Sequence, residues 1–266
     1  MKSFISIVNP RSLKQWSAVM MPSAVILALL FLWELSVAAT GIEKWILPSP
    51  TEILESLISS RELLIVHSVQ TLKETLLGLG VAIFFGIALA TLVDLSPWLQ
   101  KAIYPLLVIS QTIPIIAVAP LIMIWFGFGL LPKVVVVALV CFFPIAINLA
   151  DGFRTVDIEM IRLMKTMGAT KWQIFKMVKL PGAMPFFFSG LRIAGTYSVM
   201  GAVISEWLGA SKGLGILLTR SSQSFLTDRV FATIIVIVFL SLVIFALVEM
   251  IAKVTMRWHY QLENKQ

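Results

Sequence analysis

Long apolar runs alternate with short polar connections along this chain of 266 residues. About 20 consecutive apolar residues cross the hydrocarbon core of a bilayer as a helix, and the chain contains six runs of roughly that length. The third run contains Pro114 and Pro120, which soluble helices do not tolerate but bundled membrane helices do. The pattern predicts an all-α integral membrane protein, one transmembrane domain over 1–266 with six spans at 17–40, 68–92, 102–126, 131–150, 183–206 and 230–252.

The first run and the segment after it need separate interpretation. Residues 17–40 form a run too long for the apolar region of a cleaved signal peptide, and no small-residue cleavage site follows, so we interpret it as a retained span. In the segment 41–67, Pro50 is followed by Thr51 and by acidic residues. This order predicts the start of a short surface helix.

The composition supports a bilayer environment. The chain is 59% hydrophobic and 13% charged, with a mean hydropathy of +0.95, whereas soluble domains are nearer half apolar and a quarter charged. A net charge of +7 would suggest nucleic acid in a soluble protein, but in a membrane protein it indicates anionic lipid and topology. Cys141 is the only cysteine, and His67 and His259 have no companions at ligand spacing, so we expect no metal site.

The basic residues predict the orientation. Six spans place both termini on one side, and that side carries most of the 21 Lys and Arg residues. Because basic residues gather in cytoplasmic segments, we expect both termini and the loop 151–182 to face the cytosol. The residues on the cytoplasmic side are Lys2, Arg11, Lys14, Lys101, Arg154, Arg162, Lys165, Lys171, Lys176, Lys179, Lys253, Arg257 and Lys265; those on the other side are Lys44, Arg61, Lys133, Lys212, Arg220 and Arg229.

The loop 151–182 contains a basic amphipathic segment. Apolar residues recur at helical spacing after Asp157, and Gly168 then interrupts the helix. Thr170 and Gln173 form a capping-box pattern that starts a second helix, and Pro181 is expected to stop it. The segment predicts two short helices joined by a sharp turn. From periodicity alone it could dock on a partner protein or lie on anionic lipid.

Uncharged polar residues within the spans are candidates for a translocation pathway. Their alternative role is hydrogen bonding between helices, which contributes about 0.6 kcal/mol on average in membranes. The candidates are Ser110, Gln111, Thr112, Asn148, Tyr197, Ser198 and Ser205.

Ionisable residues near the spans have simpler explanations. Those close to span ends can reach the interface with their long side chains; these are Glu34, Glu206 and Glu249. Lys73 and Glu74 are expected to be interfacial, and Arg192 to hold neighbouring helices together.

The chain contains no G-x-x-x-x-G-K-[ST] phosphate loop. GASKGLG at 209–215 has the wrong spacing, and Lys212 is not followed by Ser or Thr. If the chain belongs to an ATP-driven transporter, the ATPase must therefore be another polypeptide. A self-sufficient secondary transporter would need intramembrane charges or inverted repeats, and a membrane enzyme would need a cluster of reactive side chains; neither is evident.

Several motifs resemble a known family. Gly168 is followed after nine residues by Val178, Leu180 and Pro181, which is similar to the loop signature of permease subunits of bacterial ATP-binding cassette (ABC) importers. WFGFGLLPK at 125–133, FFPIAINLADGFRTVD at 142–157, LPGAMPFFFSGLRIA at 180–194 and SEWLGASKGLGILL at 205–218 resemble its nitrate, sulfonate and taurine branch. The chain departs from the family E-A-A at Arg162-Leu163-Met164, so an ion pair made by that glutamate does not carry over.

The resemblance implies a six-span type I importer permease in which the two loop helices insert into a cytosolic ATPase subunit. The coupling residues it implies are Arg162, Lys165, Gly168, Ala169, Trp172, Phe175, Leu180 and Pro181. The chain itself would bind no cofactor and catalyse no reaction, since ATP and Mg²⁺ would sit on the ATPase subunit.

The expected partners are two ATPase subunits, a second copy of this chain, membrane lipid, and a periplasmic or lipid-anchored substrate-binding protein, all at a bacterial cytoplasmic (inner) membrane. SQTIPIIAVAPL at 110–121 and MGAVISEWLGASKGLG at 200–215 are most similar to relatives that carry aromatic heterocycles such as the thiamine pyrimidine precursor. Sulfonates, taurine, nitrate and bicarbonate stay open as substrates.

Overall fold

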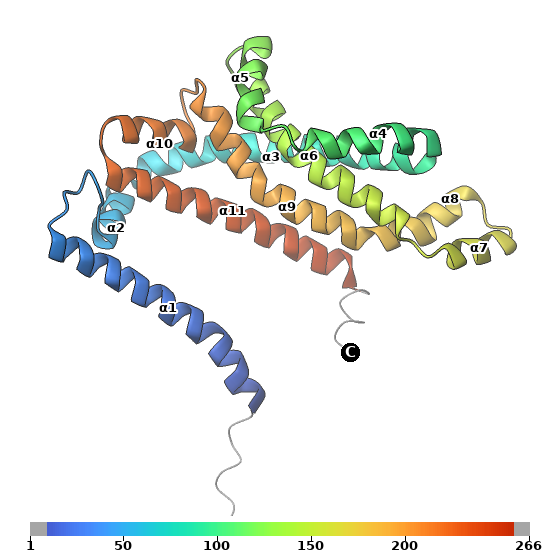
Figure 1. Ribbon diagram of the computed structural model, residues 1–266, viewed down its shortest axis with the longest axis horizontal. Coiled ribbons are helices and arrows are strands. Elements are labelled where there is room, and N and C mark those ends of the chain that lie inside the picture. The colour runs from blue at the N-terminus through green and yellow to red at the C-terminus, as the bar shows by residue number, and fades with distance from the viewer. Residues whose placement is uncertain (1–9, 258–266) are drawn as a thin grey trace, which may run out of the picture. The chain divides into compact units, whose positions relative to one another are not determined.

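The computed structural model describes residues 10–257, with side chains from Met20 onward, and this part of the chain is helical with short connections. Figure 1 shows the order of the elements. They are α1 (Pro10–Thr40), α2 (Pro50–Ser59), α3 (Arg61–Leu95), α4 (Pro97–Ser110), α5 (Ile115–Phe126), α6 (Leu130–Arg154), α7 (Ile158–Thr166), α8 (Lys171–Ile174), the π-helix η1 (Phe175–Lys179), α9 (Leu180–Trp207), α10 (Leu214–Gln223) and α11 (Thr227–Thr255).

Five helical stretches of the described chain are long and apolar enough to cross a membrane, and a sixth is obtained if α4 and α5 count as one span. The helical class predicted from the apolar runs is therefore confirmed. One span differs from the prediction, because 102–126 is not a single helix. It consists of α4 and α5, which are bent by 101° at their junction.

Proline and hydroxyl chemistry explain that break. Pro114 has no N–H to donate, and its ring keeps Ile113 out of the helical conformation. Before the break, the Ser110 hydroxyl donates to Leu106 O at 2.8 Å, and the Thr112 hydroxyl donates to Ile109 O at 2.7 Å. These side-chain hydrogen bonds add to the backbone ones at the end of α4, where the Thr112 N–H also donates to Ile109 O, whereas Pro120 stays inside α5.

One compact unit comprises, of the described residues, 10–61 and 221–232. Nearly all side chains of α1 from Met20 to Thr40 are exposed, as suits a lipid-facing helix. Glu34 accepts hydrogen bonds from the backbone N–H and the hydroxyl of Thr51. The surface helix expected at Pro50 is present as α2, with a capping box formed by Ser49 and Glu52.

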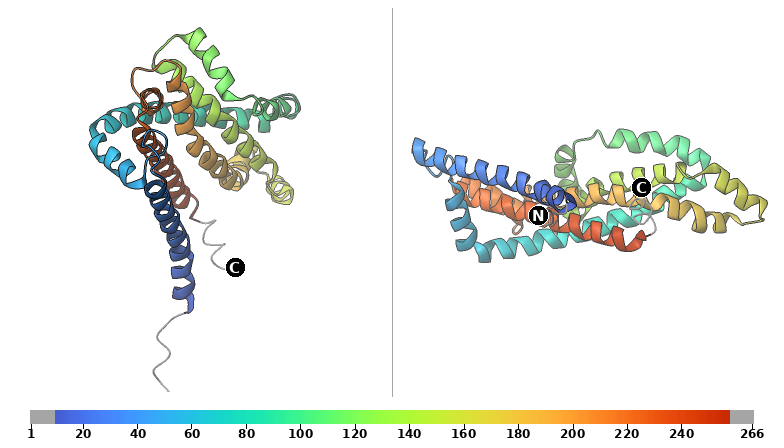
Figure 2. Two further views of the ribbon diagram at one scale, coloured as in Figure 1. Left: turned by 60° about the vertical axis from the view of Figure 1, so that its left-hand side comes forward. Right: turned by 90° about the horizontal axis from the view of Figure 1, so that it is seen from below.

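The second unit comprises, of the described residues, 62–220 and 233–257 and holds the main core. Its helices α6 and α9 pack along most of their lengths, as the views in Figures 1 and 2 show. Fully buried side chains between the helices include Cys141, Ile145, Ala194 and Ala202. The hairpin of α7 and α8 lies beyond one end of α9, and α10 follows its other end (Figure 1).

Two glycines of α3 allow α6 to approach closely. A Cβ added at Gly78 would lie 2.4 Å from Val137 Cβ, and one added at Gly86 would lie 2.8 Å from Ile145 Cγ2. A side chain at either position would collide with α6, so only glycine allows this approach. Gly80, in the same helix, has nothing within 4 Å of an added Cβ.

Candidate functional site

A helical hairpin formed by α7, a tight turn and α8 (residues 157–174) is the first candidate site. Asp157 caps α7 by accepting the Glu159 N–H at 2.8 Å. Gly168 has φ +77°, a left-handed conformation that glycine adopts without steric cost. Thr170 and Gln173 then form the predicted capping box. The turn and both helix starts are therefore as the sequence predicts.

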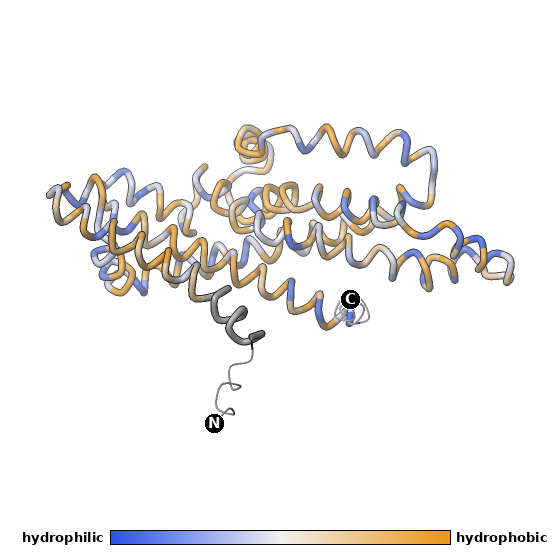
Figure 3. The backbone as a smooth tube through the Cα atoms, turned by 60° about the horizontal axis from the view of Figure 1, so that its bottom comes forward, coloured by the Kyte–Doolittle hydropathy of each residue, from blue (hydrophilic) through white to orange (hydrophobic). Residues whose placement is uncertain are grey.

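The hairpin presents apolar side chains to its surroundings. α7 has no buried residue among those described, and Met167 and Trp172 are 74% and 68% exposed. Of the predicted coupling residues, Arg162, Lys165 and Gly168 are exposed and Ala169 is half-buried. Figure 3 shows hydrophilic and hydrophobic positions interspersed along this hairpin. An exposed apolar set on a fixed turn is a surface suited to a partner.

The hairpin is anchored on one side only. The Phe175 ring lies 5.6 Å from that of Phe153 at the end of α6 and 5.8 Å from that of Trp172. Lys179 Nζ contacts both carboxylate oxygens of Asp94, near the end of α3, at 2.7 and 2.8 Å. A hollow of about 260 Å³ lies between these helix ends, lined by Thr91, Leu95, Lys171, Trp172 and Phe175. α8 and η1 are thus fixed to the bundle, whereas α7 buries none of its side chains.

The prediction that Pro181 stops the second helix is wrong. Residues Lys171–Trp207 form one continuous helical stretch. Before the proline, η1 adopts π-helical hydrogen bonding, in which the Leu180 N–H donates to Phe175 O. A turn of π-helix is wider than a turn of α-helix. It leaves room for the proline ring, and it places the missing proline N–H where the hydrogen-bond pattern changes. Leu180 is exposed and Pro181 is half-buried at this point.

Three of the predicted pathway residues come together. Ser110, Gln111 and Tyr197 line a hollow of about 290 Å³ at the break between α4 and α5, with Phe143 among the apolar side chains of its wall. Among the described residues, the Gln111 amide and the Tyr197 hydroxyl form no hydrogen bond, so both groups are available to a solute.

The other predicted pathway residues do not line this hollow. The Asn148 amide donates to Pro144 O at 2.8 Å, and the Thr112 hydroxyl donates to Ile109 O, at the end of α4. Ser198 and Ser205 are fully buried and donate to carbonyls three residues earlier, at 2.7 Å each. These two serines do not reach the hollow, because they face the packed interior.

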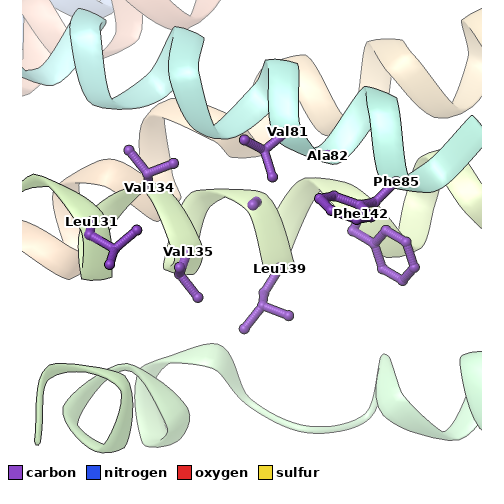
Figure 4. A pocket seen from close by; sticks show the side chains of 9 residues that line it. Val81, Ala82, Phe85, Leu131, Val134, Val135, Leu139 and Phe142 are labelled. Carbon is purple, nitrogen blue, oxygen red and sulfur yellow. The ribbon is translucent and has the colours of Figure 1, made fainter. Parts of the chain in front are cut away.

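A larger hollow of about 450 Å³ lies along α3 and α6 and contains none of the predicted pathway residues. Its wall is entirely apolar (Figure 4). The lining residues are Val81, Ala82, Phe85, Leu131, Val134, Val135, Ala138, Leu139 and Phe142.

The charged residues are paired more deeply than the sequence suggests. Arg192 Nε donates to Glu249 at 2.7 Å, which links α9 to α11 as expected for Arg192. Glu74 and Glu206 were expected at interfaces, but both are 0% exposed. Lys133 Nζ lies 2.7 Å from Glu74 Oε1. These two expectations are wrong because partners distant in sequence enclose the carboxyl groups.

The glycine-rich segment 209–215 explains the burial of Glu206. Its Oε2 accepts the Gly215 N–H at 2.6 Å, at the start of α10, and its Oε1 accepts the Thr71 hydroxyl at 2.7 Å. A Cβ added at Gly213 would lie 2.1 Å from Glu206 Cδ. The segment therefore surrounds a carboxyl group of the chain itself, where a phosphate loop would surround a phosphate. In the sequence, the only sign of this enclosure is the cluster of glycines after Glu206.

Comparison with known proteins identifies the family. A family model described as binding-protein-dependent transport system inner membrane component matches residues 82–256. The chain belongs to this family. It is the permease component of an ABC importer, a transport component of the inner membrane with several apolar helices.

Individual relatives cover nearly the whole permease. The formylaminopyrimidine transport permease protein ThiX of Halalkalibacterium halodurans is 39% identical over 89% of this chain and 95% of its own. The riboflavin transport system permease protein RibX of Chloroflexus aurantiacus is 34% identical over 92% and 91%. The taurine transport system permease protein TauC of Escherichia coli is 28% identical over 88% of each chain.

A solved structure supports the fold. A chain of the MetNI methionine ABC transporter, in an inward-facing conformation, matches with a TM-score of 0.65 at 20% identity. The match covers 74% of this permease and 97% of that chain. The type I importer fold implied by the motifs is therefore confirmed.

Proposed function

We propose that the α7–α8 hairpin docks into a cytosolic ATPase subunit and couples ATP hydrolysis to movement of the spans. The exposed apolar set on the fixed Gly168 turn carries this proposal, because α7 buries none of its side chains within the described chain. ATP and Mg²⁺ bind the ATPase subunit, and this chain binds no cofactor. The assembly contains two copies of the permease, two ATPase subunits and a periplasmic or lipid-anchored binding protein.

Two matched variants test docking against lipid binding. Leu163→Ser with Met167→Ser removes exposed apolar area, and Lys171→Gln with Lys176→Gln removes charge. Docking predicts that the first variant loses co-purifying ATPase subunit and ATP-driven uptake, while the second retains both. Binding to lipid predicts the reverse, with the second variant released from anionic vesicles.

The proposed orientation places both termini and the hairpin in the cytosol of a bacterial cell. Single cysteines at Lys165 and at Tyr260, which lies outside the described residues, report on it in a Cys141→Ala background. Cys141 is buried and is the only native cysteine. We expect both positions to resist an impermeant thiol reagent in intact cells and to react after permeabilisation. Labelling of either position in intact cells would show that the chain has the opposite orientation.

The substrate we propose is an aromatic heterocycle of the pyrimidine-precursor type. The names of two relatives, for formylaminopyrimidine and riboflavin, support this class. The hollow at the α4–α5 break also suits it, because Gln111 and Tyr197 can hydrogen-bond ring substituents beside the Phe143 ring. Uptake of formylaminopyrimidine by the assembled importer, measured beside taurine and nitrate, tests the class. Preference for taurine or nitrate would favour the sulfonate or nitrate alternative.

A further inference from the structure

The buried carboxyl groups at the end of α9 outnumber their cations. Glu74 and Glu206 are both fully buried, and Lys133, with 8% of its side chain exposed, contacts Glu74. The donors to Glu206 are a backbone N–H and a hydroxyl, which carry no charge. His67 Nδ1 contacts the backbone N and O of Gly213 at 2.9 and 2.7 Å, and Lys212 is exposed. Among the described residues, one ammonium group therefore serves two carboxyl groups.

One carboxylate oxygen of this cluster is buried and has no hydrogen-bond donor among the described residues. Glu74 Oε1 accepts from Lys133 and from the Gln70 amide, at 2.7 and 2.6 Å. Glu74 Oε2 is buried and receives no hydrogen bond from the described residues. Glu206 Oε1 accepts the hydroxyl of Thr71, which lies three residues before Glu74 on α3 and on the same face of that helix. The two buried carboxyl groups are therefore neighbours. A carboxylate cannot donate to that oxygen, but a carboxylic acid can.

We propose that Glu74 and Glu206 form a proton-binding pair, with the proton on Glu206 donated to Glu74 Oε2. The site then contains one carboxylate, one ammonium group and one neutral acid. Burial of a second charge in a low-dielectric interior costs free energy. A buried carboxyl group avoids this cost by taking up a proton. The proton also gives the unpartnered oxygen its donor.

The proton pair has a conformational consequence. Glu206 holds the start of α10 through Gly215, and Thr71 accepts the Leu214 N–H at 2.8 Å. Loss of the proton places two negative carboxylates side by side with one lysine, so it weakens the packing of α10 and the preceding loop on α3. The assembled permease therefore loses stability as the pH rises.

Infrared spectroscopy of the assembled importer tests the proton directly. We expect the wild-type complex at neutral pH to show the carbonyl stretch of a protonated carboxylic acid, and the Glu206→Gln complex to lack it. Glu62→Gln is the matched control, because Glu62 is an exposed glutamate on the same helix as Glu74; this variant keeps the band. His67→Gln also keeps it. Absence of the band from the wild-type complex overturns the proposal.

An asymmetry between the two glutamates gives a second readout. Glutamine at 206 keeps an N–H donor toward Glu74, so Glu206→Gln assembles normally and its melting temperature no longer falls with rising pH. Glu74→Gln leaves Lys133 buried without a counter-charge and lowers assembly, and adding Lys133→Met restores it. If Glu206→Gln is as damaging as Glu74→Gln, or keeps the wild-type pH dependence, Glu206 is ionised and the proton pair does not exist.

Discussion

Charged side chains are exposed near one end of α9 and buried near the other. Near its start, the α7–α8 hairpin exposes its charges and many of its apolar side chains, and α7 buries nothing among the described residues. At its end, Glu74, Lys133 and Glu206 are enclosed. A charge in water needs no partner, whereas a buried charge must be paired or neutralised. A change at the first end should therefore affect coupling, and a change at the second should affect stability.

The largest effect we expect is from Lys133→Met, which leaves the Glu74 carboxylate buried without its cation. Removing one partner of a buried ion pair costs about 3–5 kcal/mol. The melting temperature of the assembled permease measures the loss. The control is Lys212→Met, because Lys212 is an exposed lysine near the same end. It should change the melting temperature little. Equal stability of the two variants would mean that the pair at 2.7 Å contributes nothing.

At the hairpin, Gly168→Val should abolish ATP-driven uptake while the spans stay inserted. Its φ of +77° is strained for a β-branched residue, by about 1–2 kcal/mol. An added Cβ meets nothing within 4 Å, so the backbone alone is affected. Gly168→Asn is the matched control, because asparagine tolerates this conformation. Uptake and ATPase co-purification check both variants, and normal uptake with valine would contradict the coupling role of the turn.

A smaller effect is expected from Asp94→Asn, which weakens the link from η1 to α3. The partly exposed pair with Lys179 should contribute about 1 kcal/mol, since solvent screens it. Uptake falls moderately because α8 loses one anchor while the Phe153 and Trp172 contacts of Phe175 remain. The charge-swapped double variant Asp94→Lys with Lys179→Asp should recover uptake; failure to recover would assign the loss to Asp94 alone.

The smallest effect is expected from Lys171→Gln. Lys171 is exposed, and exposed substitutions usually change stability by less than about 0.5 kcal/mol. Uptake and the melting temperature should both stay near those of the unmodified chain. A large loss of ATPase binding would show that the charge itself contacts the partner.

Much of the fold follows from local signals. Apolar length predicts the spans, Pro50 with Thr51 predicts the start of α2, and Gly168 with Thr170 predicts the turn. The bend at Pro114 and the continuity through Pro181 were missed. A proline removes a donor in either case, but only the surrounding packing determines whether the helix breaks or widens into a π-turn.

The site was predictable only where it is exposed. The hairpin carries its own pattern, so periodicity and capping residues locate it. Glu206 meets Thr71 across 135 positions, and Lys133 meets Glu74 across 59. No window of sequence contains both members of such a pair, and a glutamate near a span end has the same pattern whether it reaches water or a buried partner.

The continuous stretch Lys171–Trp207 has a mechanical consequence. At 1.5 Å per residue, its 37 residues form a rod about 55 Å long. Trp172 lies near one tip and Glu206 near the other, and the rod contains no flexible linker. A push or twist applied at the Trp172 tip travels along a single backbone to the Glu206 tip. The π-turn of η1 is the one place in the rod where the winding changes, so torsion between the two tips concentrates there.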